Sequence, residues 1–186
     1  MIALREVEVG NVGPMHGTAL TIGNFDGVHL GHAALIAAAR RCVGPSGRVV
    51  AMSFDPPPAT VLSPTSPCTR LTTMDRRIEL LKACGVDEVI VQRVDRDWLE
   101  QSPEAFVLNS GLPQRPDMLV EGADFRFGHR RAGDIEALVQ FGQRHGFEIE
   151  IVPAVLGHLS NLESVPVRSS GIRWLLERGR VHDATR

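Results

Sequence analysis

The sequence has few cysteines, and none of them form a pair that is typical of a zinc site or a disulfide framework. Cys42, Cys68 and Cys84 are odd in number and far apart, without Cys-x-x-Cys spacing. No apolar run approaches the roughly 18 residues that a membrane-spanning helix requires. The first residues, MIALREVEVG, lack the apolar segment of a secretory signal. These absences favour a cytoplasmic protein without a membrane partner.

An excess of positive charge is also missing. The chain has 20 Lys and Arg against 22 Asp and Glu, a formal net charge of −2. This balance disfavours nucleic acid as a main partner, because such proteins carry a basic footprint. With 186 residues, 43% of them hydrophobic and 23% charged, the chain has the size and composition of one globular domain. We therefore expect a single domain over residues 1–186.

Segments typical of strands alternate with segments typical of helices. Short apolar runs predict strands, and longer segments with helix-forming residues or end signals predict helices. The expected strands are 19–25, 48–54, 86–94, 116–122 and 147–155, and the expected helices are 32–42, 73–85, 102–111, 133–146 and 169–181. This order predicts an α/β, Rossmann-like fold, with a mostly parallel five-stranded sheet and helices on both faces. Two stretches, 55–72 and 154–168, are expected to be irregular loops, and loops of this length are typical of a lid, a binding loop or disorder.

The segment GNFDGVHLGH, residues 23–32, joins the first expected strand to the first helix. A helix amino terminus has unpaired N–H groups and a partial positive charge, so it favours anions. Gly23 and Gly31 leave space for a ligand, and His29 and His32 can donate hydrogen bonds to phosphate oxygens. The segment therefore predicts a site for phosphoryl or nucleotidyl transfer. A His-x-x-His pair alone is more typical of surface or capping residues, and no third ligand at a recognisable spacing supports zinc.

A second segment, EGADFRFGHRRAGD, follows the fourth expected strand and so lies at the same edge of the sheet. Asp124 can accept a hydrogen bond from a ribose, a base or a backbone amide. Phe125 and Phe127 suit a ligand contact and a place in the core equally well.

A third segment, VRSSGIR, begins the last expected helix. Ser169 or Ser170 is expected to cap this helix, and Arg173 can reach an anion at its amino terminus. Taken alone, the segment also fits an ordinary capped helix with Arg173 on its exposed face.

Together these motifs resemble the nucleotidyltransferase superfamily. GNFDGVHLGH resembles the signature Gly-x-Phe-Asp-x-x-His-x-Gly-His, and GADFRFG is similar to a segment of the adenylyltransferase module of bacterial FAD synthetases. SFDPPPATVL and VRSSGIRW resemble further segments of that module, in the same order. The resemblance implies an enzyme that transfers AMP from ATP to FMN, giving FAD and pyrophosphate, with Mg²⁺ accompanying ATP.

The resemblance also implies roles for individual residues. The implied catalytic residues are His29, His32 and Arg173. The implied nucleotide-binding residues are Gly23, Asn24, Phe25, Asp26, Gly31, Gly122, Asp124, Phe127, Ser169 and Ser170. The implied flavin-binding residues are Phe54, Pro56, Pro57 and Pro58, within a proline-rich segment that is a candidate flap. No residue is implied as a metal ligand.

Three departures from the family pattern leave alternatives open. Pro57 stands where the family commonly has histidine, and Arg168 stands in place of the first serine of its Ser-Ser-Thr segment. We expect no riboflavin kinase domain within residues 1–186, so a separate riboflavin kinase is one partner to consider. The alternative functions are a nucleotidyltransferase with another phosphate acceptor and a non-catalytic protein that binds flavin or nucleotide.

Overall fold

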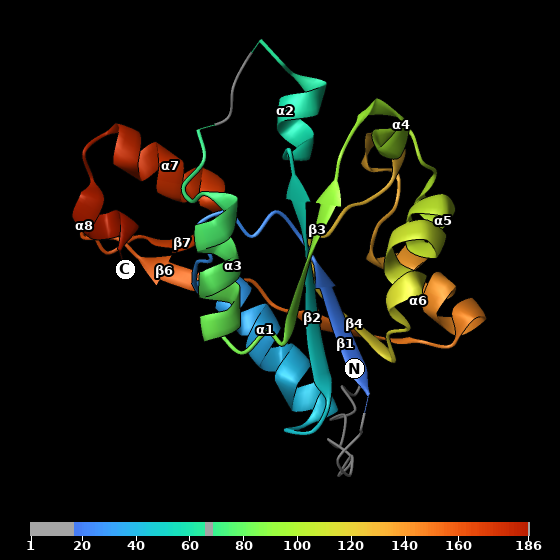
Figure 1. Cartoon of the computed structure of the whole chain (residues 1–186). Coiled ribbons are helices and arrows are strands. Elements are labelled where there is room, and N and C mark those ends of the chain that lie inside the picture. Colours follow the sequence, from blue (N-terminus) through green and yellow to red (C-terminus); the bar gives the residue numbers. More distant parts are fainter. Residues whose placement is uncertain (1–16, 66–68, 186) are drawn as a thin grey trace, which may run out of the picture.

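Five parallel strands form the centre of the computed structural model, which describes residues 17–65 and 69–185 (Figure 1). The strands are β1 (Thr18–Ile22), β2 (Arg48–Asp55), β3 (Glu88–Arg93), β4 (Met118–Gly122) and β5 (Glu148–Val152). Their order is β3-β2-β1-β4-β5, and every neighbouring pair is parallel. The predicted sheet is confirmed. The strand order reverses between β1 and β4, and in such sheets ligands bind at the carboxyl ends of the strands near this point. Cys68 and the segment MIALREVEVG lie outside the described residues.

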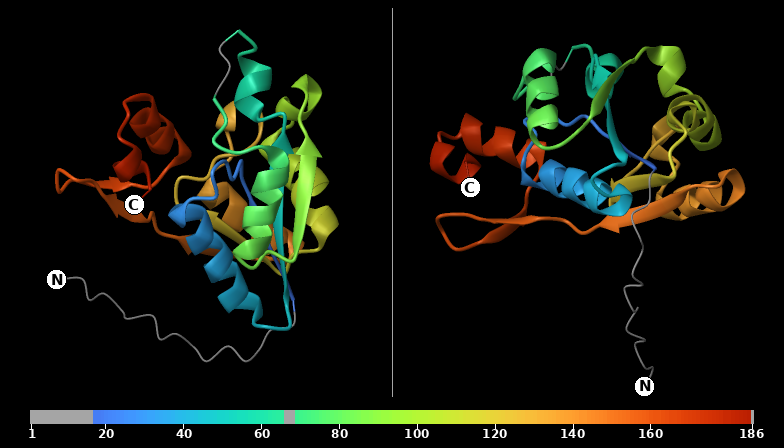
Figure 2. Two further views of the ribbon diagram at one scale, coloured as in Figure 1. Left: turned by 60° about the vertical axis from the view of Figure 1, so that its left-hand side comes forward. Right: turned by 60° about the horizontal axis from the view of Figure 1, so that its bottom comes forward.

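Helices cover both faces of the sheet, as predicted (Figures 1 and 2). The longer ones are α1 (Leu30–Val43), α3 (Met74–Ala83) and α6 (Ile135–His145). Successive side chains of a strand point to opposite faces. Leu20 therefore packs with Leu138 of α6 on one face, whereas Ala19 packs with Ile36 of α1 on the other.

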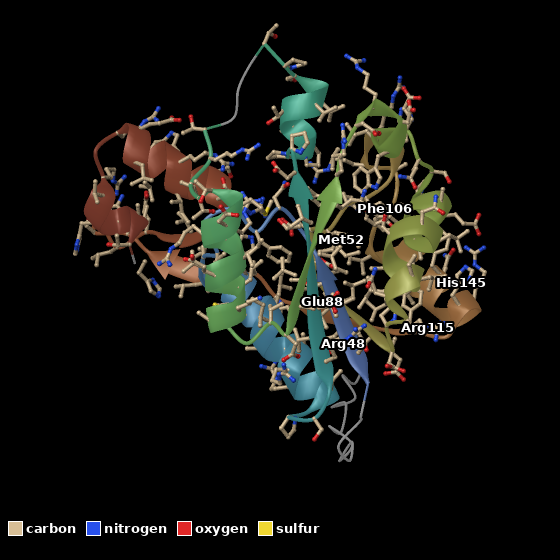
Figure 3. All side chains as sticks on the ribbon, in the orientation of Figure 1. Arg48, Met52, Glu88, Phe106, Arg115 and His145 are labelled. Atoms are coloured by element: carbon tan, nitrogen blue, oxygen red, sulfur yellow. The ribbon has the colours of Figure 1, made fainter. Side chains whose placement is uncertain are left out.

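The larger core cluster lies on the α6 face of the sheet. Met52 of β2 and Phe106, the last residue of α5 (Pro103–Phe106), both belong to it (Figure 3). At the amino-terminal ends of the strands, exposed Arg48 and Glu88 form an ion pair of 3.2 Å (Figure 3). The amino-terminal end of the sheet thus carries charged surface side chains, and the buried cluster fills the space next to it. Ligands are therefore expected at the opposite, carboxyl end of the sheet.

Three predictions of regular structure need correction, the helix 102–111 and the loops 55–72 and 154–168. The expected helix 102–111 begins as predicted, because Ser102 Oγ accepts a hydrogen bond from the Ala105 N–H (3.1 Å) and Pro103 occupies the first turn. It then continues as a π turn over Val107–Gly111 and a 3-10 turn over Leu112–Gln114. The expected loop 55–72 contains a short helix, α2 (Pro58–Leu62), and a further short helix, α4 (Arg96–Leu99), precedes α5.

The carboxyl-terminal part forms a separate layer beside α1 (Figure 2). The expected loop 154–168 is instead an antiparallel hairpin of β6 (Leu156–His158) and β7 (Ser164–Pro166). The helices α7 (Ser169–Glu177) and α8 (Val181–Ala184) follow it. Asp183 joins α8 to the hairpin turn, since its carboxylate accepts hydrogen bonds from Ser160 N–H (2.7 Å) and Arg180 Nε (2.8 Å).

Within residues 17–65 and 69–185, none of the helices combines the length and hydropathy that are needed to span a bilayer.

Candidate functional site

Two histidines stack at the amino terminus of α1. His29 is the N-cap residue of the helix, and the ring of His32 lies 3.7 Å from that of His29, centroid to centroid, at 18°. The ring of Phe25 meets His32 edge-on at 5.1 Å. Both Nδ1 atoms are buried, and neither has a hydrogen-bond partner among the described residues. A buried polar atom without a partner costs about 1–3 kcal/mol, so the two unpaired Nδ1 atoms are an energetic cost that the protein bears at this turn.

The two imidazoles are neutral at pH 7. Burial lowers the pKa of His29 to about 4, although the nearby Asp26 carboxylate opposes the shift. Burial lowers the pKa of His32 to about 3, and the charges of His29 and Arg77 act in the same direction. Each ring therefore has one N–H to donate and one nitrogen to accept, and the pair adds no charge of its own.

Asp26 links the first turn to three other parts of the chain. Its carboxylate accepts hydrogen bonds from the backbone N–H groups of Leu71 (3.0 Å) and Thr72 (3.1 Å). It also pairs with Arg77 of α3 (3.2 Å) and with Arg173 of α7 (2.8 Å). Burial alone would raise the pKa of Asp26, but these N–H groups and the Arg77 guanidinium lower it overall. The Asp26 carboxylate is therefore an ionised link within the protein.

The amino terminus of α7 faces this first turn. Arg173 lies in the middle of the helix, and Ser169 Oγ donates a hydrogen bond to the backbone oxygen of Asp26 (2.8 Å). The prediction that Ser169 or Ser170 caps α7 is wrong, because the N-cap residue is Arg168 and its side chain makes no capping hydrogen bond. Ser169 instead joins α7 to the first turn, and Ser170 is exposed.

Two glycines give the first turn its close contacts. A Cβ at Gly31 would come within 3.2 Å of the His29 ring and 3.4 Å of the Val167 carbonyl oxygen. Gly27 has a φ of +82°, and a Cβ there would lie 2.8 Å from Leu71 Cδ1. Gly23 and the exposed Asn24 complete the turn: the Gly23 N–H donates to the Met52 carbonyl oxygen (3.0 Å), and the Asn24 carbonyl oxygen accepts from Ser53 Oγ (3.1 Å). The turn is therefore packed against β2, α7 and the residues before α3.

A cavity of about 440 Å³ opens beside His29. It lies between the first turn, the hairpin and the helices α7 and α8. Its walls are mostly apolar and include Val28, Leu71, Val167, Ile172 and Leu175. Arg168 also lines the cavity and pairs with exposed Asp124 at 2.8 Å. Gly122, Asp124 and the amino terminus of α7 are thus brought to one side of the site, as the positions of the motifs predicted.

The phenylalanines of the second motif are divided between the core and its edge. Phe127 is 4% exposed and packs against Phe106 and Phe141, so the structure places it in the core, one of the two alternatives that the sequence left open. Phe125 is only partly buried and stacks on Phe127. The side chain of Phe127 therefore belongs to the core that supports the site.

The predicted flavin-binding residues lie at the end of β2. Phe54 is buried and packs against Trp98 of α4, with ring centroids 5.2 Å apart. Pro56 and Pro57 lead into α2, where Pro57 is the N-cap residue and Pro58 the first residue of the helix. Phe54 thus anchors the proline-rich segment to the core, and the prolines and α2 follow it along the chain.

Three residues of the site, Arg77, Thr72 and Ser53, were not predicted from the sequence. Arg77 is 1% exposed and donates to both Asp26 and Ser53 Oγ. Its position contained a signal, because Arg77 shares one face of the expected helix with Met74, Ile78 and Leu81. A charged residue on an apolar helix face indicates a buried partner. Thr72 and Ser53 had no such signal.

Comparisons with known proteins agree on one family. A family model described as FAD synthetase matches residues 13–165. The bifunctional riboflavin kinase/FMN adenylyltransferase of Escherichia coli (strain K12) is 35% identical over 155 residues, which are 80% of this chain and 48% of that protein. A putative bifunctional riboflavin kinase/FMN adenylyltransferase of Geobacillus thermodenitrificans (strain NG80-2) is 31% identical over 173 residues, 91% of this chain and 88% of that protein. The chain thus spans about half the length of the E. coli relative.

A solved structure supports the fold. The structure titled macrolide-efflux protein from Streptococcus pneumoniae superposes with a TM-score of 0.77 at 23% identity, over 93% of this chain and 56% of that one. At this identity, the similarity shows a shared fold only.

Proposed function

Because the chain belongs to the FAD synthetase family, we propose that it transfers AMP from ATP to FMN and forms FAD and pyrophosphate. The observation that carries this proposal is the stacked, neutral pair of His29 and His32 at the amino terminus of α1. Helix N–H groups and imidazole N–H groups together suit a phosphate, and no residue in this cluster needs to act as a nucleophile.

In the proposed reaction, an oxygen of the FMN phosphate attacks the α-phosphorus of ATP in line. The bond from the α-phosphorus to the bridging oxygen breaks, and pyrophosphate leaves with the electron pair. Catalysis then consists of positioning and of stabilising charge on the phosphoryl oxygens. We propose that His29 and His32 donate the stabilising hydrogen bonds and that Arg173 binds the pyrophosphate.

The apolar cavity beside His29 suits the adenosine of ATP. It is close enough to the first turn for a nucleoside in the cavity to place its phosphates at the histidines. We assign Asp124 and Gly122 to the edge of this nucleotide site. We assign Pro56, Pro57 and Pro58 to a flap over the flavin.

We propose that Mg²⁺ enters with ATP. Among the described residues there is no group of three or more His, Cys, Asp or Glu side chains that could hold a metal ion. The Asp26 carboxylate is also bound by protein donors. Mg²⁺ bound to nucleotides keeps several waters and takes ligands from the phosphates, so it would neutralise phosphate charge with little help from this chain.

The test is to incubate the full chain with FMN, ATP and Mg²⁺ and to follow FAD and pyrophosphate by chromatography. We expect FAD from FMN and none from riboflavin. The double variant His29→Ala with His32→Ala should lose at least about a hundredfold in rate, since one oxyanion-stabilising donor is worth about 10²–10³. His145→Ala, at the exposed end of α6, serves as the control. Turnover of the double variant within a few-fold of the parent would contradict the assignment.

A further inference from the structure

Asp26 has two guanidinium partners that differ sharply in burial. The side chain of Arg77 is 1% exposed, whereas that of Arg173 is 21% exposed. Both ion pairs use the same carboxylate, Arg77 at Oδ1 and Arg173 at Oδ2. One carboxylate thus holds two cations from different helices.

Arg77 is fixed in place. Its Nη2 donates to Asp26 and its Nη1 donates to Ser53 Oγ (3.3 Å), which in turn donates to the Asn24 carbonyl oxygen. Because an unpaired buried charge is strongly disfavoured, Arg77 and Asp26 hold one another.

Arg173 is held less firmly. Its contact with Asp26 is a single hydrogen bond of 2.8 Å, and the side chain lies at the more open side of the cluster, on α7. A phosphate offers the same kind of charge-assisted hydrogen bond as a carboxylate. Arg173 can therefore exchange one anion for the other without leaving the site.

We infer that Arg77 is the resident counter-ion of Asp26 and acts as a positioning residue that releases Arg173 to the phosphates. The inference rests on the proposed function for the identity of the anion. When Arg173 turns to phosphate, Asp26 remains paired with Arg77 and with the N–H groups of Leu71 and Thr72. Without Arg77, that movement would leave a buried carboxylate with no cation, and Asp26 would retain Arg173.

The experiment measures binding of Mg²⁺–ATP and of adenosine to the full chain by calorimetry. Arg77→Met should weaken ATP binding by about tenfold or more, the size of one charged hydrogen bond, and leave adenosine binding within about twofold. Arg77→Lys keeps the charge and should recover most of the loss. In an Arg173→Met background, Arg77→Met should cause no further loss of ATP affinity, because the two residues act in one chain of contacts.

A second variant guards against misfolding. If Arg77→Met abolishes the cooperative thermal transition, Arg77→Gln takes its place, because Gln keeps a hydrogen-bond donor at the buried position and lacks the charge. This variant should show the same selective loss of ATP affinity. Equal losses for ATP and adenosine, or a full loss in the Arg173→Met background, would overturn the inference, as would a parent chain that fails to bind ATP. A parent chain that binds ATP with this pattern but forms no FAD would overturn the proposed reaction and leave the role of Arg77 standing.

Discussion

At the scale of the residue, burial determines the charge of the site. His29 and His32 are partly buried in surroundings that disfavour their protonated forms, and the ionised Asp26 offsets only part of this effect. The first turn therefore presents neutral donors to a ligand, while its positive charge comes from Arg77 and Arg173. This division keeps the histidines available at neutral pH.

Replacing His32 by Asn should make the free energy of unfolding less dependent on pH. The pKa of His32 is about 3 in the folded protein and near its ordinary value of 6.5 in the unfolded chain. Between these values the unfolded chain binds a proton that the folded protein does not, so stability falls as the pH falls through this range. Chemical denaturation at pH 7 and pH 5 measures the difference.

The parent should lose more stability between pH 7 and pH 5 than the Asn variant. His145→Asn is the control, because His145 is exposed at the end of α6 (Figure 3). An identical loss in the parent and in His32→Asn would show that His32 does not remain neutral.

At the scale of the element, the turn between β1 and α1 depends on Gly27. Ala at this position should destabilise the protein and weaken ATP binding. A positive φ costs an L-residue about 1–2 kcal/mol, and the new Cβ would also press on Leu71, whose N–H holds Asp26. Gly146→Ala is the matched control, since Gly146 has a φ of +79° and no atom near its Cβ position.

Urea denaturation and calorimetry with ATP test this prediction. Gly146→Ala should show the backbone cost alone and bind ATP normally. If both variants lose the same stability and both bind ATP like the parent, the contact with Leu71 does not constrain the turn.

Between β1 and β4, a buried acid replaces part of the strand pairing. The two strands pair at Ala19–Met118 and Leu20–Leu119, and beyond this point the Ile22 N–H donates to Glu121 Oε1 (2.6 Å). Burial raises the pKa of Glu121 well above its ordinary value of 4.5. The folded protein thus keeps a proton that the unfolded chain loses, and stability falls as the pH rises above about 4.5.

Glu121→Gln should therefore gain stability relative to the parent as the pH rises from 4 to 7. Gln keeps an oxygen for the Ile22 N–H and cannot ionise. Glu148→Gln, exposed at the start of β5, should show no such trend. Thermal unfolding at several pH values measures both variants, and a constant difference between Glu121→Gln and the parent would contradict the assignment.

The elements that sequence patterns predicted well are those whose burial repeats along the chain. The strands are short apolar runs between turn signals, and α6 begins and ends at clear cap residues. The hairpin of β6 and β7 was missed because both strands are short and largely exposed. The predicted cap of α7 was wrong because Ser169 Oγ donates its hydrogen bond to the backbone oxygen of Asp26, which is 143 residues away. Partners so distant in sequence leave no local pattern.

At the scale of the whole molecule, the site joins two parts of the chain that pack differently. The sheet and its helices share two large core clusters, whereas α7 packs chiefly against α8. Its links to the first turn are polar contacts at Asp26. Parts with few buried apolar contacts open more readily than the core.

Hydrogen exchange followed by mass spectrometry should show this difference. Amides of α7 should exchange faster than those of β1 and β2, and ATP should slow exchange in α7 and around His29 together. Peptides from α6 provide the reference that ATP leaves unchanged. Protection of α6 equal to that of α7 would indicate a general stabilisation and contradict a site closed by α7.

The 147 residues that separate Asp26 from Arg173 also set an order of events during translation. At about 5–20 residues per second, a ribosome takes roughly 7–30 s to add Arg173 after Asp26. During that interval the nascent chain can gather the histidine pair, Asp26 and Arg77, but it has no α7. The proposed nucleotide site is therefore completed only after Arg173 has been added, well after its first turn.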